Sequence, residues 1–330
     1  MRAALLAGFG GPEVIVTGDA PDPTPGPGEM LIKVRATAVN RADLMQRAGR
    51  YPPPVGASEI LGLEAAGEVL QVHPGTRTPF RTGDRVMCLM SGGGYAELAV
   101  VPVGQAMRMP ERLGWVEAAA VPEVFLTAFL SLRLLGRLDS GGTALVHSIA
   151  SGVGTAAAQI CRALGATCIG TSRDPARART AETWGATGIG SADGRFADDV
   201  RGLTDGRGAD VIVDLVGAAY WKENVAALSR SGRIILTGLV GGRTAEVDLG
   251  ALLPLQATVI ASTLRGRTPA EKADIVSAFT DWGLPLIASG ALEPVVYAVM
   301  PLSEAAVAHR LVASDAVVGK VVLVPERGRA

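Results

Sequence analysis

The sequence predicts an α/β protein of two domains, one β-rich and barrel-like and one built on a doubly wound parallel sheet. Three observations support this prediction. From Thr143 onward, buried strand patterns alternate regularly with helical ones, which is typical of parallel βαβ units. Residues 1 to about 110 instead show short β-branched runs between Gly and Pro clusters, as in a small barrel. With 330 residues and 48% apolar content, the chain has room for two hydrophobic cores.

The first third is expected to consist mainly of short strands bounded by turn residues. β-branched runs with Gly or Pro at their ends predict strands at 1–6, 14–17, 30–37, 67–72, 85–89 and 96–101. The proline-rich segment 21–29, PDPTPGPGE, predicts a rigid loop between two of these strands. A long helical pattern first appears over 116–136, with an interruption at Pro122.

A denser segment between these strands holds the first candidate site residues. Asn40 is placed to cap a helical turn over 41–47. Asp43 and Arg47 are four positions apart, so they can pair on one helix face. Tyr51 directly precedes three prolines, which make this a stiff place for a phenolic hydroxyl. Capping and pairing alone would also explain Asn40 and Asp43, so a structural and a functional interpretation both stay open.

A second candidate is a carboxylate in apolar surroundings. Glu64 lies in the run 60–67, ILGLEAAG, which otherwise contains only apolar residues and glycine. A carboxylate there needs a partner, so Glu64 is expected to be structural or catalytic and not a surface residue. Lys320, in an apolar run near the end of the sequence, is expected to be structural.

The second domain is organised around a strand, a turn of small residues and a helix. The strand covers 143–147, the turn begins at Ser148, and an Ala-rich helix follows Thr155. Such a turn aims free backbone N–H groups and the positive end of the helix dipole at one point, which suits a pyrophosphate. Because Ser148 stands where Gly or Ala usually opens the motif, an ordinary tight turn is the alternative. The candidate phosphate-binding residues are Ala150, Ser151, Gly152, Val153 and Gly154.

The end of the next strand, over 167–171, predicts the preferred cofactor. In dinucleotide-binding folds, the residue that reads the ribose follows the turn by about 20 positions. Asp174 precedes a proline and is better explained as a helix N-cap than as a ribose ligand. Ser172, Arg173 and Arg177 surround it, and guanidinium groups match a 2′-phosphate well. We therefore expect NADPH in preference to NADH, with solvated surface arginines as the alternative.

Two later strands end in glycine-containing loops. Because ligands of doubly wound sheets bind beyond the carboxyl ends of the strands, these loops are expected to contact the nicotinamide half of the cofactor. Asp214 is expected to cap its strand end and not to act as a catalytic acid. The candidate residues of the two loops are Val216, Gly217, Gly238, Leu239 and Val240.

Composition and charge narrow the classes of partner. The net charge of −1 offers no general attraction for nucleic acid or an anionic membrane surface. Three scattered cysteines, Cys88, Cys161 and Cys168, form neither a disulfide framework nor a zinc cluster. No apolar run is long enough to cross a membrane, and the start of the sequence lacks a secretion signal. These features predict a soluble, cytoplasmic protein.

Four motifs occur in order along the chain. They are Asn40-x-x-Asp43-x-x-x-Arg47-x-Gly49-x-Tyr51, Gly62-x-Glu64-x-x-Gly67, the turn Ser151–Gly154 and the terminal run Val318–Leu323. Together they resemble the quinone oxidoreductase family of the medium-chain dehydrogenase/reductase superfamily. The similarity is greatest to its tumour-suppressor-inducible branch, is more distant to zeta-crystallin, and covers nearly the whole chain.

The resemblance implies a specific domain plan. A GroES-like β-barrel catalytic domain would span 1–124 and 265–330, and a Rossmann domain that binds NADPH would span 125–264. It also implies a homodimer joined at sheet edges through the strand at 258–264, and it places Thr127 beside the nicotinamide.

Zinc-dependent members of this superfamily carry metal ligands that this chain lacks. They have a cysteine near the position of Asn40, a histidine at the position of Leu63 and four close cysteines near 90–110. Here Cys88 is solitary in that region, and the three histidines of the chain are far apart. Because a tetrahedral site needs three or four convergent ligands, we expect a metal-free enzyme.

Two further departures concern the cofactor. Relatives often have a tyrosine where this chain has Ser191 and an asparagine where it has Val317. We therefore expect NADPH to bind less tightly than it does in those relatives.

The expected reaction is direct hydride transfer from NADPH to a quinone or a related conjugated carbonyl compound. Such a transfer depends on proximity and a shielded nicotinamide more than on a strong acid. Tyr51 and Asn40 would donate hydrogen bonds to the developing oxyanion, and Asp43 would orient them. Asn40 would also contact the cofactor.

Two other functions remain open from the sequence. An enone, enal or enoyl-thioester reductase would use the same hydride, and Arg41, Arg47 and Arg50 could form a basic rim for an acyl carrier. A non-enzymatic, NADPH-binding structural or regulatory protein is the other alternative.

Overall fold

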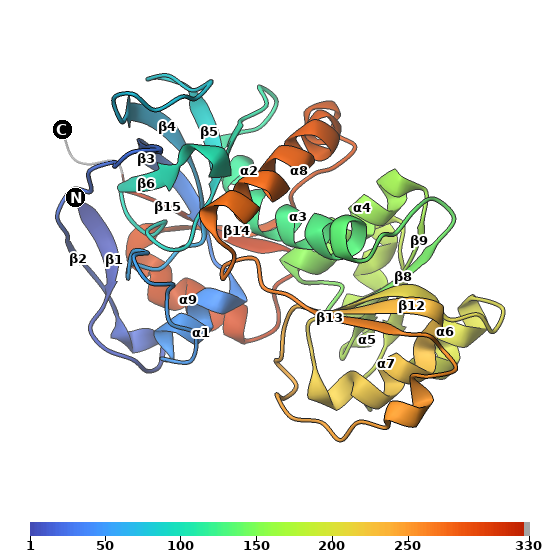
Figure 1. The fold of residues 1–330 in the computed structure, drawn as a ribbon. Helices are drawn as coiled ribbons and strands as arrows, with labels where there is room; N and C mark the ends of the chain where they lie inside the picture. Colours follow the sequence, from blue (N-terminus) through green and yellow to red (C-terminus); the bar gives the residue numbers. More distant parts are fainter. Residues whose placement is uncertain (327–330) are drawn as a thin grey trace. The chain divides into compact units, whose positions relative to one another are not determined.

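The computed structural model describes residues 1–326, and these fold as two compact units (Figure 1). The β-rich unit contains Met1–Leu126, Leu264–Gly290 and the chain from Pro294 onward. The parallel-sheet unit contains Thr127–Thr263 and the short return Ala291–Glu293. The second unit is therefore an insertion in the first, and the final strands of the chain rejoin the fold of its beginning.

The β-rich unit is built on a seven-stranded, mostly antiparallel sheet of order β14-β15-β3-β4-β5-β7, with β6 paired to β3. A separate hairpin-like pair, β1 and β2, adds a second small sheet. Its strands are β1 (Arg2–Leu6), β2 (Ile15–Asp19), β3 (Glu29–Ala38), β4 (Glu64–Val72), β5 (Arg85–Leu89), β6 (Leu98–Pro102), β7 (Ala106–Arg108), β14 (Val296–Pro301) and β15 (Lys320–Val324). The strands expected in the first third are all present, within a few residues of their predicted ends.

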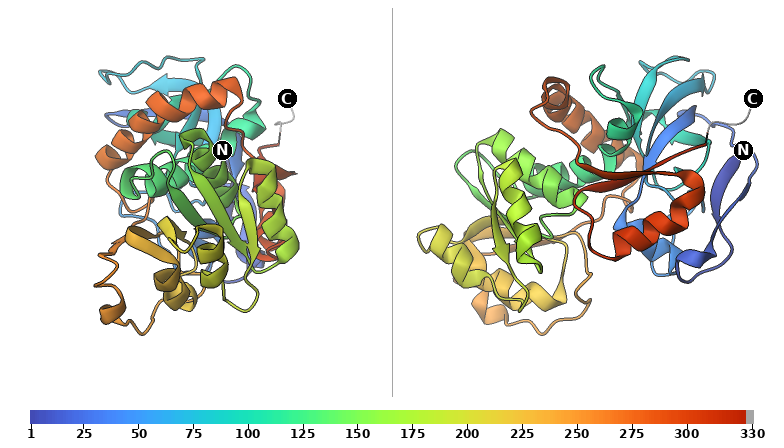
Figure 2. Two further views of the ribbon diagram at one scale, coloured as in Figure 1. Left: turned by 90° about the vertical axis from the view of Figure 1, so that its right-hand side faces the viewer. Right: turned by 180° about the vertical axis from the view of Figure 1, so that it is seen from behind.

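Helices cover this sheet, and they come from both ends of the chain. In the right-hand view of Figure 2, the red helix α9 lies beside the red strands β14 and β15, which it also contacts. The α-helices of the unit are α1 (Arg41–Arg47), α2 (Trp115–Ala119), α8 (Pro269–Ser289) and α9 (Ala305–Ala313). Short 3-10 helices occupy Pro12–Val14, Val103–Gln105 and Leu302–Glu304. Helix α3 (Pro122–Phe129) crosses into the second unit and continues as a π-helix over Leu130–Leu135.

Helix α8 begins at a capping box. Thr268 is the N-cap, its hydroxyl accepts the N–H of Glu271 at 3.2 Å, and Glu271 accepts the N–H of Thr268 at 2.8 Å. This reciprocal pair satisfies two of the N–H groups at the helix start, and Pro269 fits the first helical position because it needs no N–H partner. Arg265 is consequently in the connection before the helix, where its side chain can turn into the unit.

The parallel-sheet unit has six parallel strands in the order β10-β9-β8-β11-β12-β13. If the six strands are numbered along the chain starting from β8, their order in the sheet is 3-2-1-4-5-6, as in dinucleotide-binding sheets. The direction in which successive strands are added to the sheet therefore reverses between β8 and β11. The strands are β8 (Thr143–His147), β9 (Thr167–Ser172), β10 (Thr187–Gly190), β11 (Ala209–Asp214), β12 (Leu228–Leu236) and β13 (Thr258–Ala261). The predicted α/β class and doubly wound sheet are confirmed.

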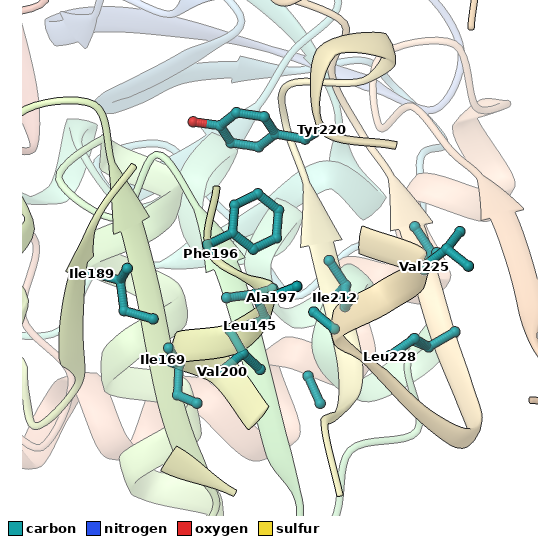
Figure 3. Packing of buried hydrophobic residues seen from close by; sticks show 13 residues of the cluster. Leu145, Ile169, Ile189, Phe196, Ala197, Val200, Ile212, Tyr220, Val225 and Leu228 are labelled. Atoms are coloured by element: carbon teal, nitrogen blue, oxygen red, sulfur yellow. The ribbon is translucent and has the colours of Figure 1, made fainter. Parts of the chain in front are cut away.

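Helices alternate with these strands as expected from the βαβ pattern. They are α4 (Gly152–Leu164), α5 (Pro175–Arg179), α6 (Ala197–Leu203) and α7 (Trp221–Ala227), with 3-10 turns at Thr180–Trp184, Ala218–Tyr220 and Leu249–Ala251. One apolar core of this unit packs Leu145, Ile169 and Ile212 from neighbouring strands against Val200 of α6 (Figure 3). Above them, the rings of Phe196 and Tyr220 have centroids 5.0 Å apart.

Within residues 1–326, no helix is both long enough and apolar enough to span a bilayer.

Candidate functional site: a buried charge cluster and a dinucleotide turn

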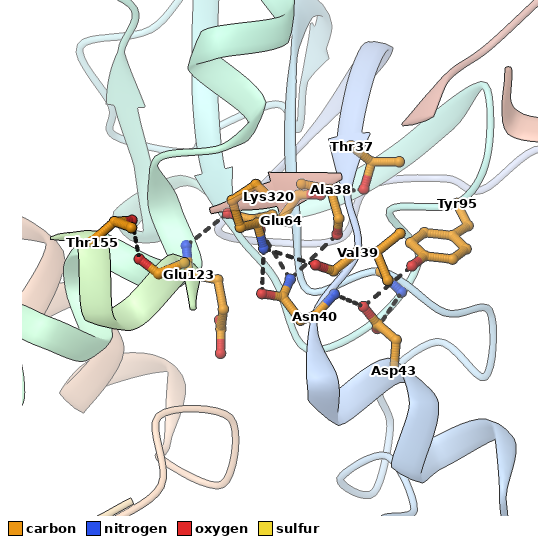
Figure 4. Close-up of polar contacts among 12 residues, drawn as sticks. Thr37, Ala38, Val39, Asn40, Asp43, Glu64, Tyr95, Glu123, Thr155 and Lys320 are labelled. Atoms are coloured by element: carbon orange, nitrogen blue, oxygen red, sulfur yellow. Dashed lines mark hydrogen bonds and ion pairs between the residues drawn. The ribbon is translucent and has the colours of Figure 1, made fainter. Parts of the chain in front are cut away.

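The β-rich unit contains a fully buried carboxylate at the first residue of β4. Oε1 of Glu64 accepts a hydrogen bond from Nδ2 of Asn40 at 2.9 Å and lies 2.8 Å from Nζ of Lys320 (Figure 4). Oε2 of Glu64 accepts the backbone N–H of Glu123 at 2.8 Å. The carboxylate that the sequence placed among apolar residues is thus paired by a buried ammonium group and two further donors, which offset the cost of its burial.

Asn40 uses both ends of its amide inside this cluster. Nδ2 donates to the carbonyl of Ala38 at 3.3 Å as well as to Glu64, and Oδ1 accepts from Nζ of Lys320 at 2.5 Å. Asn40 is also the N-cap of α1, as expected. Both amide hydrogens therefore already have acceptors within the unit, and the structure favours a role for Asn40 in holding Glu64 and Lys320 in place.

Asp43 is buried one helical turn from Asn40. Its Oδ2 accepts the backbone N–H of Asn40 at 2.8 Å and the hydroxyl of Tyr95 at 3.3 Å, and Oδ1 accepts the N–H of Gly62 at 3.1 Å. Burial raises the pKa of Asp43 to about 6, although the two backbone N–H groups and Lys320 favour the ionised form. Asp43 thus fixes the start of α1 against the loop that precedes β4.

The expected pairing of Asp43 with Arg47 is wrong. Arg47 instead donates from Nε to the carbonyl of Gly10 at 3.1 Å, and its Nη1 lies 3.3 Å from Nδ1 of His309. Burial lowers the pKa of His309 to about 3, so this imidazole is neutral. Since guanidinium can only donate, Nδ1 of His309 is the acceptor, and Nε2–H faces the hydroxyl of Tyr95 at 3.2 Å. Because α9 packs on α1, Arg47 contacts His309 instead of Asp43, which precedes it by four positions on α1.

Tyr51 is partly exposed and is held by a buried arginine. The guanidinium carbon of Arg265 lies 5.2 Å from the centroid of the Tyr51 ring, and Nη1 donates to the carbonyl of Tyr51 at 3.3 Å. The same guanidinium donates to Oε1 of Gln46 at 2.6 Å and to the carbonyl of Ser91 at 2.9 Å. Arg265 therefore joins the segment after α1 to the loop after β5, and it fixes the orientation of the Tyr51 ring.

Three side chains of this region have no counterpart among the sequence predictions. Lys272 on α8 is buried and donates from Nζ to Oγ of Ser91 at 2.6 Å. Arg265 is buried beside it, and Glu123 lies at the start of α3. The argument that singled out Glu64, a carboxylate in an apolar run, applies equally to Glu123. Nothing in the local pattern distinguishes Lys272 from a surface lysine of an amphipathic helix.

In the parallel-sheet unit, the turn after β8 has the geometry of a phosphate-binding turn. Ser148 adopts φ 53°, a left-handed conformation that glycine usually occupies, so the serine at this position does not prevent the tight turn. Ser151 caps α4 by accepting the N–H of Gly154 on its hydroxyl at 3.1 Å. The N–H groups of Gly152 and Val153, in the first turn of α4, have no intrahelical carbonyl to bond, which leaves them available for an anion.

A close approach of backbone explains why Gly154 must lack a side chain. A Cβ at Gly154 would lie 2.3 Å from the carbonyl oxygen of Ile149. A Cβ added at Gly170 on β9 would lie 2.3 Å from Cγ1 of Ile149. The helix and the two strands therefore pack tightly around Ile149, and Ala150 and Ser151 are carried at the tip of the turn.

The segment after β9 contains the residues predicted for the cofactor's adenosine end. Asp174 caps α5 by accepting the N–H of Ala176 at 2.8 Å, which confirms its interpretation as an N-cap. Ser172 is buried at the strand end, and Arg173 and Arg177 flank the cap. A tyrosine hydroxyl also reaches this region, because Tyr220 lies 2.9 Å from Oγ of Ser191.

The loop after β11 is held by the strand's own terminal carboxylate. Oδ1 of Asp214 accepts the N–H groups of Val216 at 2.7 Å and Gly217 at 2.9 Å, and Oδ2 accepts from Nδ2 of Asn224 at 2.9 Å. Oδ1 of Asn224 lies 2.6 Å from Nε2 of the buried His147. Asp214 therefore caps its strand, as predicted, and it does so as part of a buried chain of polar groups.

The loop after β12 carries the remaining predicted cofactor residues. Gly238 packs directly on the backbone of Leu215, and a Cβ there would lie 2.7 Å from its carbonyl oxygen. Leu239 and Val240 expose 48% and 62% of their surfaces, so an apolar ligand face could cover them. Thr127 lies at the beginning of this unit, where its carbonyl accepts the hydroxyl of Ser131 at 2.8 Å.

Comparisons with known proteins agree with this geometry. Residues 26–111 match the alcohol dehydrogenase GroES-like domain, and residues 152–280 match the zinc-binding dehydrogenase family. The chain is 34% identical to a quinone oxidoreductase of Pseudomonas aeruginosa over 97% of this chain and 98% of that protein.

The chain belongs to the quinone oxidoreductase family of the medium-chain dehydrogenase/reductase superfamily.

Solved structures of similar proteins share the whole fold. The Escherichia coli quinone oxidoreductase complexed with NADPH has a TM-score of 0.88 and 28% identity, covering 98% of this chain and all of that one (100%). A mycobacterial protein complexed with NADPH has a TM-score of 0.87 and 30% identity, with 98% and 100% coverage. The GroES-like and Rossmann domains expected from the sequence are confirmed.

The donor set of this family member does not fit a zinc ion. No group of three His, Cys, Asp or Glu side chains converges anywhere in residues 1–326. Glu64, the carboxylate bonded to the Asn40 side chain, has each oxygen engaged by a protein donor, and Lys320 already supplies its positive partner. A divalent cation there would have to displace Lys320 from contacts of 2.5 to 3.0 Å.

Proposed function

We propose that this protein is an NADPH-dependent reductase that delivers hydride to quinones or related conjugated carbonyl compounds without a bound metal. The observation that carries the proposal is the Ser151-capped start of α4, placed after β8 where the strand order reverses. Ligands of doubly wound sheets bind at this point, and a helix N-terminus suits a pyrophosphate. The quinone oxidoreductases among the relatives support the reaction class.

In this proposal the parallel-sheet unit holds the cofactor. Within the turn from Ala150 to Gly154, the free N–H groups of Gly152 and Val153 would bind the pyrophosphate, and Ser172, Arg173 and Arg177 would bind the 2′-phosphate. Val216, Gly217, Gly238, Leu239 and Val240 would pack against the nicotinamide half, with Thr127 at its carboxamide. When bound, NADPH supplies the hydride, and the protein supplies position and exclusion of water.

The substrate side of the proposal relies on Tyr51. Its ring is braced by Arg265, and its segment is stiffened by the prolines that follow. Asn40 and Asp43 would act as supports, because the amide hydrogens of Asn40 already have acceptors and Asp43 accepts three hydrogen bonds. We expect Tyr51→Phe to lower kcat/KM by roughly tenfold through loss of one oxyanion donor, with unchanged NADPH affinity. Full activity in this variant would remove Tyr51 from the mechanism.

The basic rim needed for an acyl carrier is weaker than the sequence indicated. Arg41 pairs with Asp315 at 2.6 Å, and Arg47 is buried against His309 and the carbonyl of Gly10. Only Arg50 of the three remains exposed without an ion pair in the described chain. A small quinone is therefore favoured over an enoyl thioester.

The test measures the rate of NADPH oxidation with 1,2-naphthoquinone as the acceptor and, separately, with a crotonyl thioester at the same concentration. We expect turnover with the quinone and at least tenfold lower kcat/KM with the thioester. The reverse order would make the protein an enoyl-thioester reductase. Tight NADPH binding with no turnover on any quinone or enone would favour a non-enzymatic, cofactor-binding protein.

The proposal includes a homodimer that pairs the β13 edges of two subunits. β13 is the terminal strand of its sheet, and Val259 on it exposes 41% of its surface. An unpaired edge of this kind is suited to sheet extension. Sedimentation should give a dimer for the wild type and a monomer for Val259→Lys. A dimer that survives this substitution would place the interface elsewhere.

A further inference from the structure

One partly buried acidic group of the β-rich unit has no role in the scheme above. Glu123 is the second residue of α3, and its backbone N–H donates to Oε2 of Glu64 at 2.8 Å. Its side chain points away from the cluster of Glu64, Lys320 and Asn40 (Figure 4). Oε2 of Glu123 is buried and has no hydrogen-bond partner among residues 1–326.

Charged groups from five segments are electrostatically coupled to this carboxyl. Glu64 of β4 and Asp43 of α1 disfavour its ionisation, whereas Lys320 of β15 and Lys272 of α8 favour it. A negative charge on Glu123 also raises the pKa of Arg265, which precedes α8. The described chain contains no ion pair between Glu123 and any of the three cations, because each of them is directed to another acceptor.

Two cations on the α8 side are bonded to neutral groups. Lys272 donates to Oγ of Ser91 at 2.6 Å, and Arg265 donates to the carbonyl of Ser91 and to Oε1 of Gln46. Neither compensates the burial of Glu123, which raises its pKa to about 8. This pKa favours the protonated carboxyl at neutral pH, and Oε2 has no hydrogen-bond partner among residues 1–326.

An O–H group in this position is costly unless a ligand supplies the acceptor. A buried polar group without a partner destabilises a fold, because it loses its hydrogen bonds to water and gains none in return. Perturbed acids of this kind concentrate at sites of proton transfer, since a catalytic acid works best with a pKa near the working pH.

We propose that Glu123 is the general acid of the reduction, donating its carboxyl proton to the oxygen of the carbonyl acceptor. This inference rests on the proposed function. The acceptor gains a hydride from the nicotinamide, and its carbonyl electrons move onto oxygen. The O–H bond of Glu123 breaks as the new O–H bond forms, which yields a neutral hydroquinone or enol. Glu123 is left as a carboxylate and regains its proton from water.

The variant Glu123→Gln keeps the shape of the side chain and removes the acid. At saturating NADPH, we expect kcat to fall about 10²-fold or more, in line with the contribution of a positioned general acid. Wild-type kcat/KM should be constant below pH 7 and fall above pH 8, whereas the glutamine variant should lack this decline. Glu111→Gln, at an exposed glutamate, serves as the matched control and should leave rate and profile unchanged.

Two further measurements separate catalysis from structure. Glu123→Asp retains an acid on a shorter side chain and should restore part of the rate together with the alkaline decline. Infrared difference spectra of the cofactor-free protein should show a protonated carboxyl that titrates near pH 8 and is absent from Glu123→Gln. NADPH affinity, followed by fluorescence, should stay within twofold in both variants.

Either of two results would overturn the assignment. One is a Glu123→Gln variant with wild-type kcat and an unchanged pH profile, and the other is an infrared titration showing Glu123 ionised at pH 7. Both would leave the proposed reductase function standing. Failure of the wild-type protein to reduce any quinone or enone would overturn the reductase function and the role of Glu123 together.

Discussion

The candidate sites of the two units are built from different kinds of group. The β-rich unit buries charged side chains, with Glu64 and Lys320 at 0% and 4% exposure and 2.8 Å apart. The parallel-sheet unit relies on backbone N–H groups and on the absence of side chains, as at Gly154. The first arrangement depends on the identity and protonation of individual residues. The second depends on close backbone packing and should be insensitive to pH near neutrality.

The largest expected effect comes from breaking the charge cluster of the β-rich unit. Lys320→Met should lower the free energy of unfolding by roughly 3–5 kcal/mol, because it leaves the buried Glu64 without its cation. Denaturant unfolding measures this. Removing the exposed partner Arg2 of the Arg2–Asp19 pair is the control and should change stability little. If Lys320→Met were as mild as the control, the cluster would not be the electrostatic core described above.

A steric change should have the next largest effect, in the other unit. Gly154→Ala should cost roughly 1–3 kcal/mol, because the added Cβ meets the carbonyl of Ile149 at 2.3 Å and α4 must shift. NADPH affinity should fall with it, as the turn moves. Gly202→Ala, inside α6 with open space around it, is the matched control and should stabilise by about 0.5–1 kcal/mol. Equal behaviour of the two glycines would contradict the packing argument.

Arginine substitutions would test whether any side-chain charge matters for cofactor choice. Arg173→Ala and Arg177→Ala should each weaken NADPH binding by about tenfold, equivalent to roughly 1.4 kcal/mol, and leave NADH binding unchanged. Titrations of both cofactors by fluorescence measure this. Arg179→Ala, on the same helix α5, is the control. Parallel losses for NADH and NADPH would mean that these arginines do not read the 2′-phosphate.

The smallest expected effect is a pH dependence specific to the β-rich unit. The folded pKa of Asp43, about 6, exceeds its ordinary value of 3.8, so the folded state binds this proton more tightly. Its contribution to stability therefore increases as the pH falls through 6. Between pH 7 and 5 the wild type should gain roughly 1 kcal/mol relative to Asp43→Asn. A difference between the two proteins that is constant over this range would show that Asp43 titrates normally.

Local sequence patterns determined most of the fold. The strands of both units, the N-cap at Asp174 and the small-residue turn from Ser148 to Gly154 follow from alternation, capping rules and turn chemistry. Each of these depends on residues within a few positions of one another. Glu64 could also be identified as a paired, buried carboxylate from its apolar neighbours alone.

The partners of the charged residues were decided by tertiary structure. Lys320 meets Asn40 across 280 positions, and Arg47 meets His309 across 262, which displaced the helical pairing expected from a spacing of four. Glu123 differs from other glutamates because α3 buries one of its oxygens without a partner. Local periodicity reports which face of an element is apolar, but it carries no information about which distant charge will be brought to that face. The protonation states on which the chemistry depends therefore arise only when the chain has folded.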